Sequence, residues 1–288
     1  MIPVILDCDN TMGIKERDVD DGLALLYLLG SENIDLLAVT TTFGNSTIED
    51  VYPNTKRIFS ELNISIPLYR GAPSTKNRNS EAAKALVEIV NKRPNEITVL
   101  ATGSMTNLKA AYDLDKTFFH KVKEIVMMGG IEKPLLVNGK PMNELNFASD
   151  SEAIQSVLKH GKNITIITGH ICLKAVFNYQ TYHSMENLVG EKIYNFIMKE
   201  TKPWIEYIGG LYGMDGFCNW DAVAAVYLDH PELFDDRMVK VGADIKDLNT
   251  GFLKENTKEG NEIHIPEEIL DIELFNKILI DGWSKVKL

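Results

Sequence analysis

The hydrophobic and polar positions of the chain alternate between short apolar runs and longer segments with helical spacing. Apolar runs rich in β-branched residues predict strands over residues 3–9, 34–43, 65–70, 97–102, 122–128 and 163–168. The segments between them predict helices over residues 20–30, 47–62, 80–92, 105–114 and 150–160. Strands that alternate with helices in this way indicate right-handed crossovers. We therefore expect an α/β fold with an open, mostly parallel, Rossmann-related sheet flanked by helices.

The last third of the chain has a different character. From about residue 175 it is richer in helical spacing and in aromatic residues, with one late strand predicted at 239–245. The Lys and Glu runs in 253–268 indicate a solvated face. No repeat, linker or shift of composition divides the sequence, so we expect a single domain over residues 1–288 with a helical C-terminal part.

Composition narrows the class of protein. The formal net charge is −11 and no basic stretch offsets it, which argues against binding nucleic acid or an anionic membrane. The three cysteines, Cys8, Cys172 and Cys218, are scattered and form no zinc or disulfide pattern. No apolar run approaches the roughly 18 residues that span a bilayer. These features predict a cytoplasmic protein that acts on a small molecule.

Polar residues gather where the predicted strands end. Asp7 and Asp9 close the first strand, and the pairs Gly44–Asn45, Thr102–Gly103 and Gly129–Gly130 follow three others. Parallel sheets bind ligands at the carboxyl edge of their strands. We therefore expect these loops to converge on one site.

Five aspartates occur within fifteen residues near the N-terminus: Asp7, Asp9, Asp18, Asp20 and Asp21. Crowded carboxylates need a cation or shared protons to relieve their repulsion. One interpretation is a phosphatase, because "DCDNT" resembles the first motif of haloacid-dehalogenase-like enzymes. In that case Asp7 would be the nucleophile and Mg²⁺ the cofactor. The late acidic pair of such enzymes is poorly matched by Asp244 and Asp247, so this stays the alternative.

A second resemblance uses the whole chain. "LDCD" followed by "DVDDGLALLYLL" resembles the D-x-D-P-G-x-D-D signature of the inosine/uridine-preferring nucleoside hydrolases. The resemblance continues in the order of that family through "TTTFGN" (40–45), "VLATGSMTNL" (99–108), "IVMMGG" (125–130), "ELNFASDSEA" (144–153) and "NWDAVAAVYL" (219–228). It implies hydrolysis of the N-glycosidic bond of a ribonucleoside to ribose and a free base.

The resemblance also implies a metal site. Asp9, Asp21, Asp221 and the backbone carbonyl of Thr102 match the metal ligands of the family, and an all-oxygen shell suits Ca²⁺. Asp20 is then left as the general base for the attacking water. Asp7 is expected to accept backbone hydrogen bonds that order the metal loop.

Substrate-binding residues follow from the same motifs. Asn45, Glu144 and Asn146 match residues that contact the ribose, and Asn138 matches more loosely. Trp220 stands where many members carry a histidine that protonates the leaving base, and an indole can stack on a base but cannot supply that proton. Asn107 is expected to be structural.

Two departures from the family pattern affect these expectations. Asp9 and Asp20 are eleven positions apart, so "NTMGIKERDV" carries an insert of about seven residues that either bulges outward or tilts the metal loop. Asp18 belongs to this insert and is expected to face solvent. The missing histidine leaves Tyr207, Tyr212 and Asp215 as candidate proton donors, and His170 is the one histidine we would test. By analogy with the family we also expect a homo-oligomer, and a degenerate relative that binds nucleosides without turnover stays a further alternative.

Overall fold

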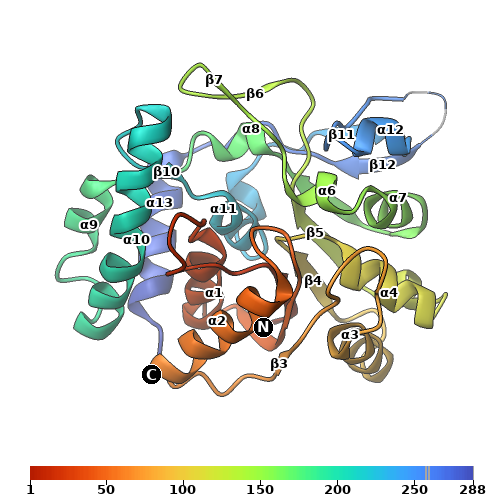
Figure 1. The fold of residues 1–288 in the computed structure, drawn as a ribbon, viewed down its shortest axis with the longest axis horizontal. Coiled ribbons are helices and arrows are strands. Elements are labelled where there is room, and N and C mark those ends of the chain that lie inside the picture. Colours follow the sequence, from red (N-terminus) through yellow and green to blue (C-terminus); the bar gives the residue numbers. More distant parts are fainter. Residues whose placement is uncertain (257, 259, 288) are drawn as a thin grey trace.

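A single eight-stranded sheet forms the centre of the computed structural model, which describes residues 1–256, 258 and 260–287 (Figure 1). Its strand order is β11-β12-β8-β5-β4-β1-β2-β3. All neighbours are parallel except β11 and β12, which are antiparallel. The strands are β1 (Ile2–Cys8), β2 (Ile34–Thr41), β3 (Leu68–Tyr69), β4 (Thr98–Ala101), β5 (Glu124–Met128), β8 (Ile164–Ile167), β11 (Met238–Val241) and β12 (Asn261–His264).

Helices cover both faces of this sheet (Figure 1). One face packs against α1 (Asp20–Gly30), α2 (Ile48–Glu61), α10 (Glu191–Tyr212), α11 (Trp220–Tyr227) and α13 (Ile272–Ser284). The other packs against α3 (Glu81–Lys92), α4 (Thr106–Leu114), α5 (Phe118–Lys121), α7 (Ser151–His160) and α12 (Ile245–Leu248). Shorter elements are α6 (Asn146–Ser149), α8 (Gly169–Cys172), α9 (Tyr179–Met185), η1 (Pro231–Leu233) and the strand pairs β6 (Leu135–Val137) with β7 (Lys140–Met142) and β9 (Val176–Phe177) with β10 (Phe217–Cys218).

Burial on both faces explains why the strands are apolar runs instead of alternating sequences. In β1, Val4, Leu6 and Cys8 belong to the core cluster on one face, and Ile5 belongs to the cluster on the other. A strand covered on both sides has no position that benefits from a polar side chain. The α/β fold predicted from the sequence is confirmed.

The strand β12 differs from the prediction for residues 253–268. This stretch was predicted to be a solvated face, yet Asn261–His264 pairs with β11 and, through His264 and Thr165, with β8. Ile263 and Ile265 are buried in the core. The strand is short and flanked by charged residues, so its place comes from pairing with distant segments and not from its own pattern.

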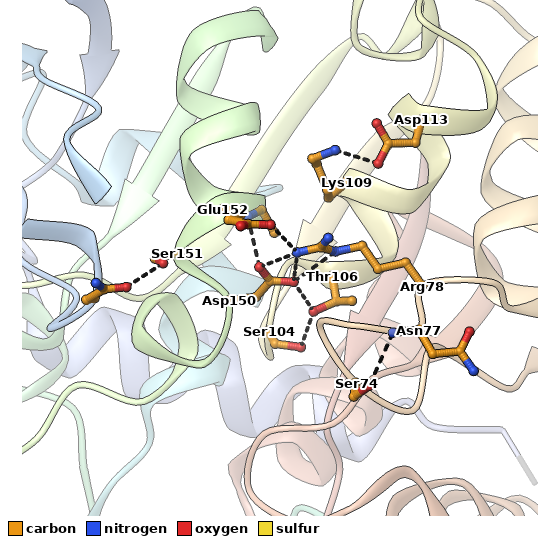
Figure 2. Close-up of polar contacts among 12 residues, drawn as sticks. Ser74, Asn77, Arg78, Ser104, Thr106, Lys109, Asp113, Asp150, Ser151 and Glu152 are labelled. Carbon is orange, nitrogen blue, oxygen red and sulfur yellow. Dashed lines mark hydrogen bonds and ion pairs between the residues drawn. The ribbon is translucent and has the colours of Figure 1, made fainter. Parts of the chain in front are cut away.

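A hydrogen-bonded network fixes the turn that follows β4 (Figure 2). Arg78 donates to the buried carboxylate of Asp150, with Nη2 2.9 Å from Oδ1. Asp150 also caps α7 through the Ala153 amide and accepts from the Thr106 hydroxyl at 2.8 Å. Ser104 continues the chain of contacts, because its hydroxyl lies 3.2 Å from that of Thr106 and 2.8 Å from that of Thr42. The turn after Thr102 is thereby tied to α7 and to the loop that contains Arg78.

We predict that Asp150→Ala lowers the free energy of unfolding by about 3 kcal/mol or more. The change removes the buried carboxylate that accepts hydrogen bonds from Arg78 and Thr106 and leaves both donors without this partner. Glu152→Ala is the matched control. Glu152 also pairs with Arg78, at 3.0 Å, but its side chain is 63% exposed, so the change should cost about 1 kcal/mol or less. Denaturant unfolding of both variants checks this, and equal losses would contradict the role given to the buried network.

Candidate active site

Four aspartates from distant parts of the chain meet at the carboxyl edge of the sheet. Asp9 follows β1, Asp20 and Asp21 begin α1, and Asp221 lies in the first turn of α11. Carboxylate oxygens of Asp20, Asp21 and Asp221 lie within 4.8 Å of one another. Two helix N-termini point at this cluster, and the amides of Asp21 and Asp221 both donate to Asp20 at 3.2 Å. Helix N-termini favour nearby negative charge, which helps to hold the group together.

These carboxylates are buried, with exposed fractions between 0 and 3%. Desolvation, opposed in part by the hydrogen bond from the Asn45 amide, raises the pKa of Asp9 to about 6. Desolvation and then the charges of neighbouring aspartates raise the pKa of Asp21 and of Asp221 well above their usual range. None of the ion pairs among the described residues includes a member of the cluster. The cluster therefore needs retained protons or a bound cation.

The donor set fits a hard divalent cation. Asp21 accepts from the Thr102 hydroxyl at 2.7 Å through Oδ1, while no donor from the described part of the chain reaches its buried Oδ2. Every candidate ligand is oxygen, and neither Cys nor His belongs to the group of clustered side chains. Such a set suits Ca²⁺ or Mg²⁺ better than a transition metal.

The Thr102 carbonyl is held in place by Asn146. The Asn146 amide donates to the carbonyls of Thr102 at 2.9 Å and Met128 at 3.1 Å, which joins the ends of β4 and β5. Glu144 fixes this segment, since its carboxylate accepts from the amides of Gly130, Phe147 and Ala148. Glu144 and Asn146, two of the predicted ribose-contacting residues, thus lie in the cavity wall and also position their neighbours.

Asn45 lies against Asp9. Its backbone amide donates to Asp9 Oδ2, and its side-chain amide lies 3.3 Å from Oδ1. The preceding Gly44 is required by this close approach, because a Cβ there would lie 1.9 Å from Asp9 Oδ2. Asn45 also lines the cavity, as a ribose-binding residue must.

Asp7 is turned away from the cavity. Asp7 was expected to accept backbone hydrogen bonds, but its Oδ1 accepts from two side chains, the Thr40 hydroxyl at 2.6 Å and the Asn107 amide at 2.8 Å. Desolvation raises its pKa to about 7. Asn107 also bonds to the Thr41 carbonyl and the Ala72 amide, which fits its expected structural role. Asp7 is fully buried and does not line the cavity, so the geometry does not support its use as a phosphatase nucleophile.

The insert after Asp9 folds inward against α2 and α10. Asn54 donates to the carbonyls of Asn10 and Met12 at 3.2 and 3.1 Å. Arg57 donates to Met12 O at 2.9 Å and pairs with Glu200 of α10 at 3.1 Å. Asn10, Thr11 and Met12 are thus buried, whereas Gly13 and residues 15–17 are exposed, and Asp20 and Asp21 still begin α1 at the site.

Asp18 is the main correction that this insert brings. It was expected to face solvent, but its carboxyl lines the cavity close to Asp20, and its pKa is raised well above the usual range by desolvation and by the Asp20 charge. The Thr11 hydroxyl donates to the Asp18 backbone carbonyl at 2.8 Å, and no local signal in the sequence reveals this path of the insert.

A cavity of about 300 Å³ opens beside the aspartates. Trp220 lines it, as do the two candidate proton donors Tyr207 and Tyr212. Trp204, which the sequence analysis did not single out, also lines it from α10. Sequence reasoning could have found Trp204 from its place on the long amphipathic helix α10, which also carries Tyr207.

Three other candidates lie elsewhere. Asn138 sits in the β6–β7 turn, where its amide donates to the carbonyls of Tyr212 and Gly213 at 2.8 and 3.1 Å, so it fastens the hairpin to the end of α10. It does not line the cavity with the aspartates, and neither do His170 and Asp215. Desolvation lowers the pKa of His170, which disfavours the protonated form that a proton donor needs.

The chain resembles known proteins over nearly its whole length. It is 29% identical over 247 residues to uridine nucleosidase 1 of Arabidopsis thaliana, covering 75% of this chain and 72% of that protein. It is 25% identical over 259 residues to the pyrimidine-specific ribonucleoside hydrolase RihB of Shigella flexneri, covering 80% and 79%. No described helix meets the length and apolarity needed to cross a membrane.

Solved structures show the same fold. A plant nucleoside hydrolase, PpNRh1, superposes with a TM-score of 0.85 at 21% identity and covers 98% of each chain. A purine-preferring ribonucleoside hydrolase from Gardnerella vaginalis gives 0.84 at 20% identity, covering 99% of this chain and 98% of that one. The family model described as inosine-uridine preferring nucleoside hydrolase matches residues 4–277. The chain therefore belongs to the family of inosine-uridine preferring nucleoside hydrolases, which are metal-dependent enzymes of the glycosidase class.

Proposed function

We propose that this protein hydrolyses the N-glycosidic bond of ribonucleosides to ribose and free base, with Ca²⁺ held by Asp9, Asp21, Asp221 and the Thr102 carbonyl. The observation that carries the proposal is the buried aspartate cluster beside a cavity lined by amides and aromatic rings. Family membership supports the reaction. When bound, the cation would lower the pKa of a coordinated water and bind vicinal sugar hydroxyls.

Asp20 is the proposed general base. Of the buried aspartates in the cluster, Asp20 and Asp221 line the cavity, and Asp9 and Asp21 do not. Asp20 can therefore accept a proton from a water that attacks the anomeric carbon, while Asp221 serves as a ligand. Positive charge develops on the ribose ring in the transition state, and the surrounding carboxylates stabilise it. Asn45, Glu144 and Asn146 present polar groups to the sugar hydroxyls.

The direct test is a panel of ribonucleosides incubated with the protein, with and without chelator, and read as released reducing sugar. We expect release that the chelator abolishes and added Ca²⁺ restores. Nucleoside binding without any release would instead mean a degenerate relative, and phosphate release from phosphoesters would favour the phosphatase alternative.

We predict that Asp20→Asn lowers kcat by about 10²–10⁴, the usual range for loss of a general base, and leaves metal binding intact. Asp9→Asn, its matched control, should instead weaken the metal. Kinetics and calcium titration of both variants check this. If Asp9→Asn kept the metal and lost turnover while Asp20→Asn changed mainly KM, the base would be Asp9, and Asp20 would bind the sugar.

Asp221→Ala should abolish stabilisation by Ca²⁺, because it removes the ligand that α11 contributes to the cluster. The increase in Tm on adding Ca²⁺ measures this effect. Asp113→Ala, on the exposed side of α4, is the control and should respond like the parent protein. Unchanged Ca²⁺ stabilisation in Asp221→Ala would show that this ligand is wrongly assigned.

The stabilisation by Ca²⁺ should grow between pH 5.5 and pH 7.5. Raised pKa values, such as about 6 for Asp9, mean that without metal the folded protein holds more protons than the unfolded chain in this range, so its stability falls as pH rises. Binding a cation releases those protons, which becomes easier as pH rises. Calorimetry at both pH values checks this, and a larger Ca²⁺-induced increase in Tm at the lower pH would contradict it.

A further inference from the structure

The cavity beside the aspartates is lined by acidic side chains, and among the described residues of its wall none is basic. Five carboxylic side chains reach it: Glu16, Asp18, Asp20, Glu144 and Asp221. Among the described residues of its wall there is no Lys, Arg or His. A wall of this kind offers nothing that would bind a phosphate or an anionic leaving group, and it attracts positive charge.

The insert is responsible for part of this acidity. It places Asp18 in the same cavity wall as Asp20. Glu16 lies at the more exposed rim, where Lys15 Nζ is 3.4 Å from its carboxylate. Asp18 is therefore the insert's deeper carboxylate, and it is held by the Thr11 hydroxyl, which donates to its backbone carbonyl at 2.8 Å, and by the Val19 amide, which donates to its Oδ1 at 2.7 Å.

Aromatic rings complete the wall. Trp204 and Tyr207 of α10 are stacked, with ring centroids 5.5 Å apart and planes 28° apart, and both line the cavity with Trp220. The faces of such rings attract cations, most strongly for Trp. A flat, positively charged ring would therefore be bound both by stacking on the aromatic side chains and by attraction to the carboxylates.

The chemistry of the leaving group points the same way. When a neutral nucleobase departs, the electron pair of the broken bond leaves it anionic unless a group donates a proton. Trp220 lines the wall but has no acidic proton to give, and the Thr102 hydroxyl donates to Asp21. The other hydroxyl donors among the described residues of the wall are the phenols of Tyr207 and Tyr212. A base that is already cationic departs neutral and needs no proton.

We propose that the preferred substrates are cationic N-ribosides, in which ribose is joined to the ring nitrogen of a pyridinium. This inference rests on the proposed function and names its substrate class. Water adds to the anomeric carbon, the carbon–nitrogen bond breaks, and its electron pair neutralises the ring nitrogen. The proton of the water passes to Asp20 and then to solvent, so the products are ribose, a neutral pyridine and one proton.

The experiment compares the calcium-loaded protein on nicotinamide riboside, uridine and inosine, with kcat/KM read from released ribose. The 5′-phosphate of nicotinamide riboside is the fourth substrate. We expect kcat/KM for the cationic riboside to exceed both neutral values by about tenfold or more, and its 5′-phosphate to react at least about tenfold more slowly.

The variant Asp18→Asn separates the electrostatic field of the cavity from the intrinsic lability of each substrate. The intrinsic lability is the same for the parent protein and the variant, so it cancels when the ratio of kcat/KM between two substrates is compared between these two proteins. The ratio of kcat/KM for nicotinamide riboside to kcat/KM for uridine should fall about fivefold in Asp18→Asn. It should stay unchanged in Asp113→Asn on α4. Asn retains the acceptor for the Val19 amide that Asp18 Oδ1 provides, so the loop is preserved.

Each outcome has one meaning. Neutral nucleosides that react as fast as the cationic riboside would overturn this proposal and leave the hydrolase function standing. An unchanged ratio in Asp18→Asn would overturn the role of the insert's carboxylate in substrate choice. Failure to release ribose from every unphosphorylated substrate would overturn the proposed function itself.

Discussion

The mutual repulsion of buried carboxylates is the constraint on which this structure depends. Asp9, Asp20, Asp21 and Asp221 are almost completely removed from water, and no basic side chain is paired with them among the described residues. Ionised carboxylates buried this close together are energetically unfavourable, and the fold tolerates them when protons or a cation neutralise their charge. We interpret this cost as the means by which the fold favours a hard divalent ion, since binding one would offset the repulsion among the carboxylates.

The rest of the fold serves to bring these residues together from both ends of the sequence. Helix α1 supplies two aspartates and packs against α11, which supplies the last one. Helix α13 closes over α1, where the Trp283 indole donates to the Leu23 carbonyl at 3.0 Å. The two helices approach so closely that a Cβ on Gly30 would lie 1.8 Å from the Gly282 carbonyl oxygen. A displacement of α13 would therefore disturb α1 and the geometry of the site.

The sequence predicted what local pattern controls and missed what distant contacts control. The helix over 20–30 has the predicted bounds, because paired aspartates favour its start and leucines fill its buried positions. The strand β12 was missed because a four-residue, charge-rich segment becomes a strand through pairing with its neighbours. The approach of Asp18 to the cavity was also missed, because the path of the insert is fixed by tertiary contacts such as those of Arg57 and Asn54 to Met12, which no local pattern reveals. Motif matching also failed at Asn138, whose amide binds the end of α10 instead of facing the cavity.

A crystal structure of the protein with Ca²⁺ and ribose tests the central claim most directly. The account predicts one ion bonded to the carboxylates of Asp9, Asp21 and Asp221 and to the Thr102 carbonyl, with sugar hydroxyls bound to the same ion. Ordered ribose in the cavity beside a cluster that holds no cation would contradict it, as would a calcium ion bound only at another place on the protein.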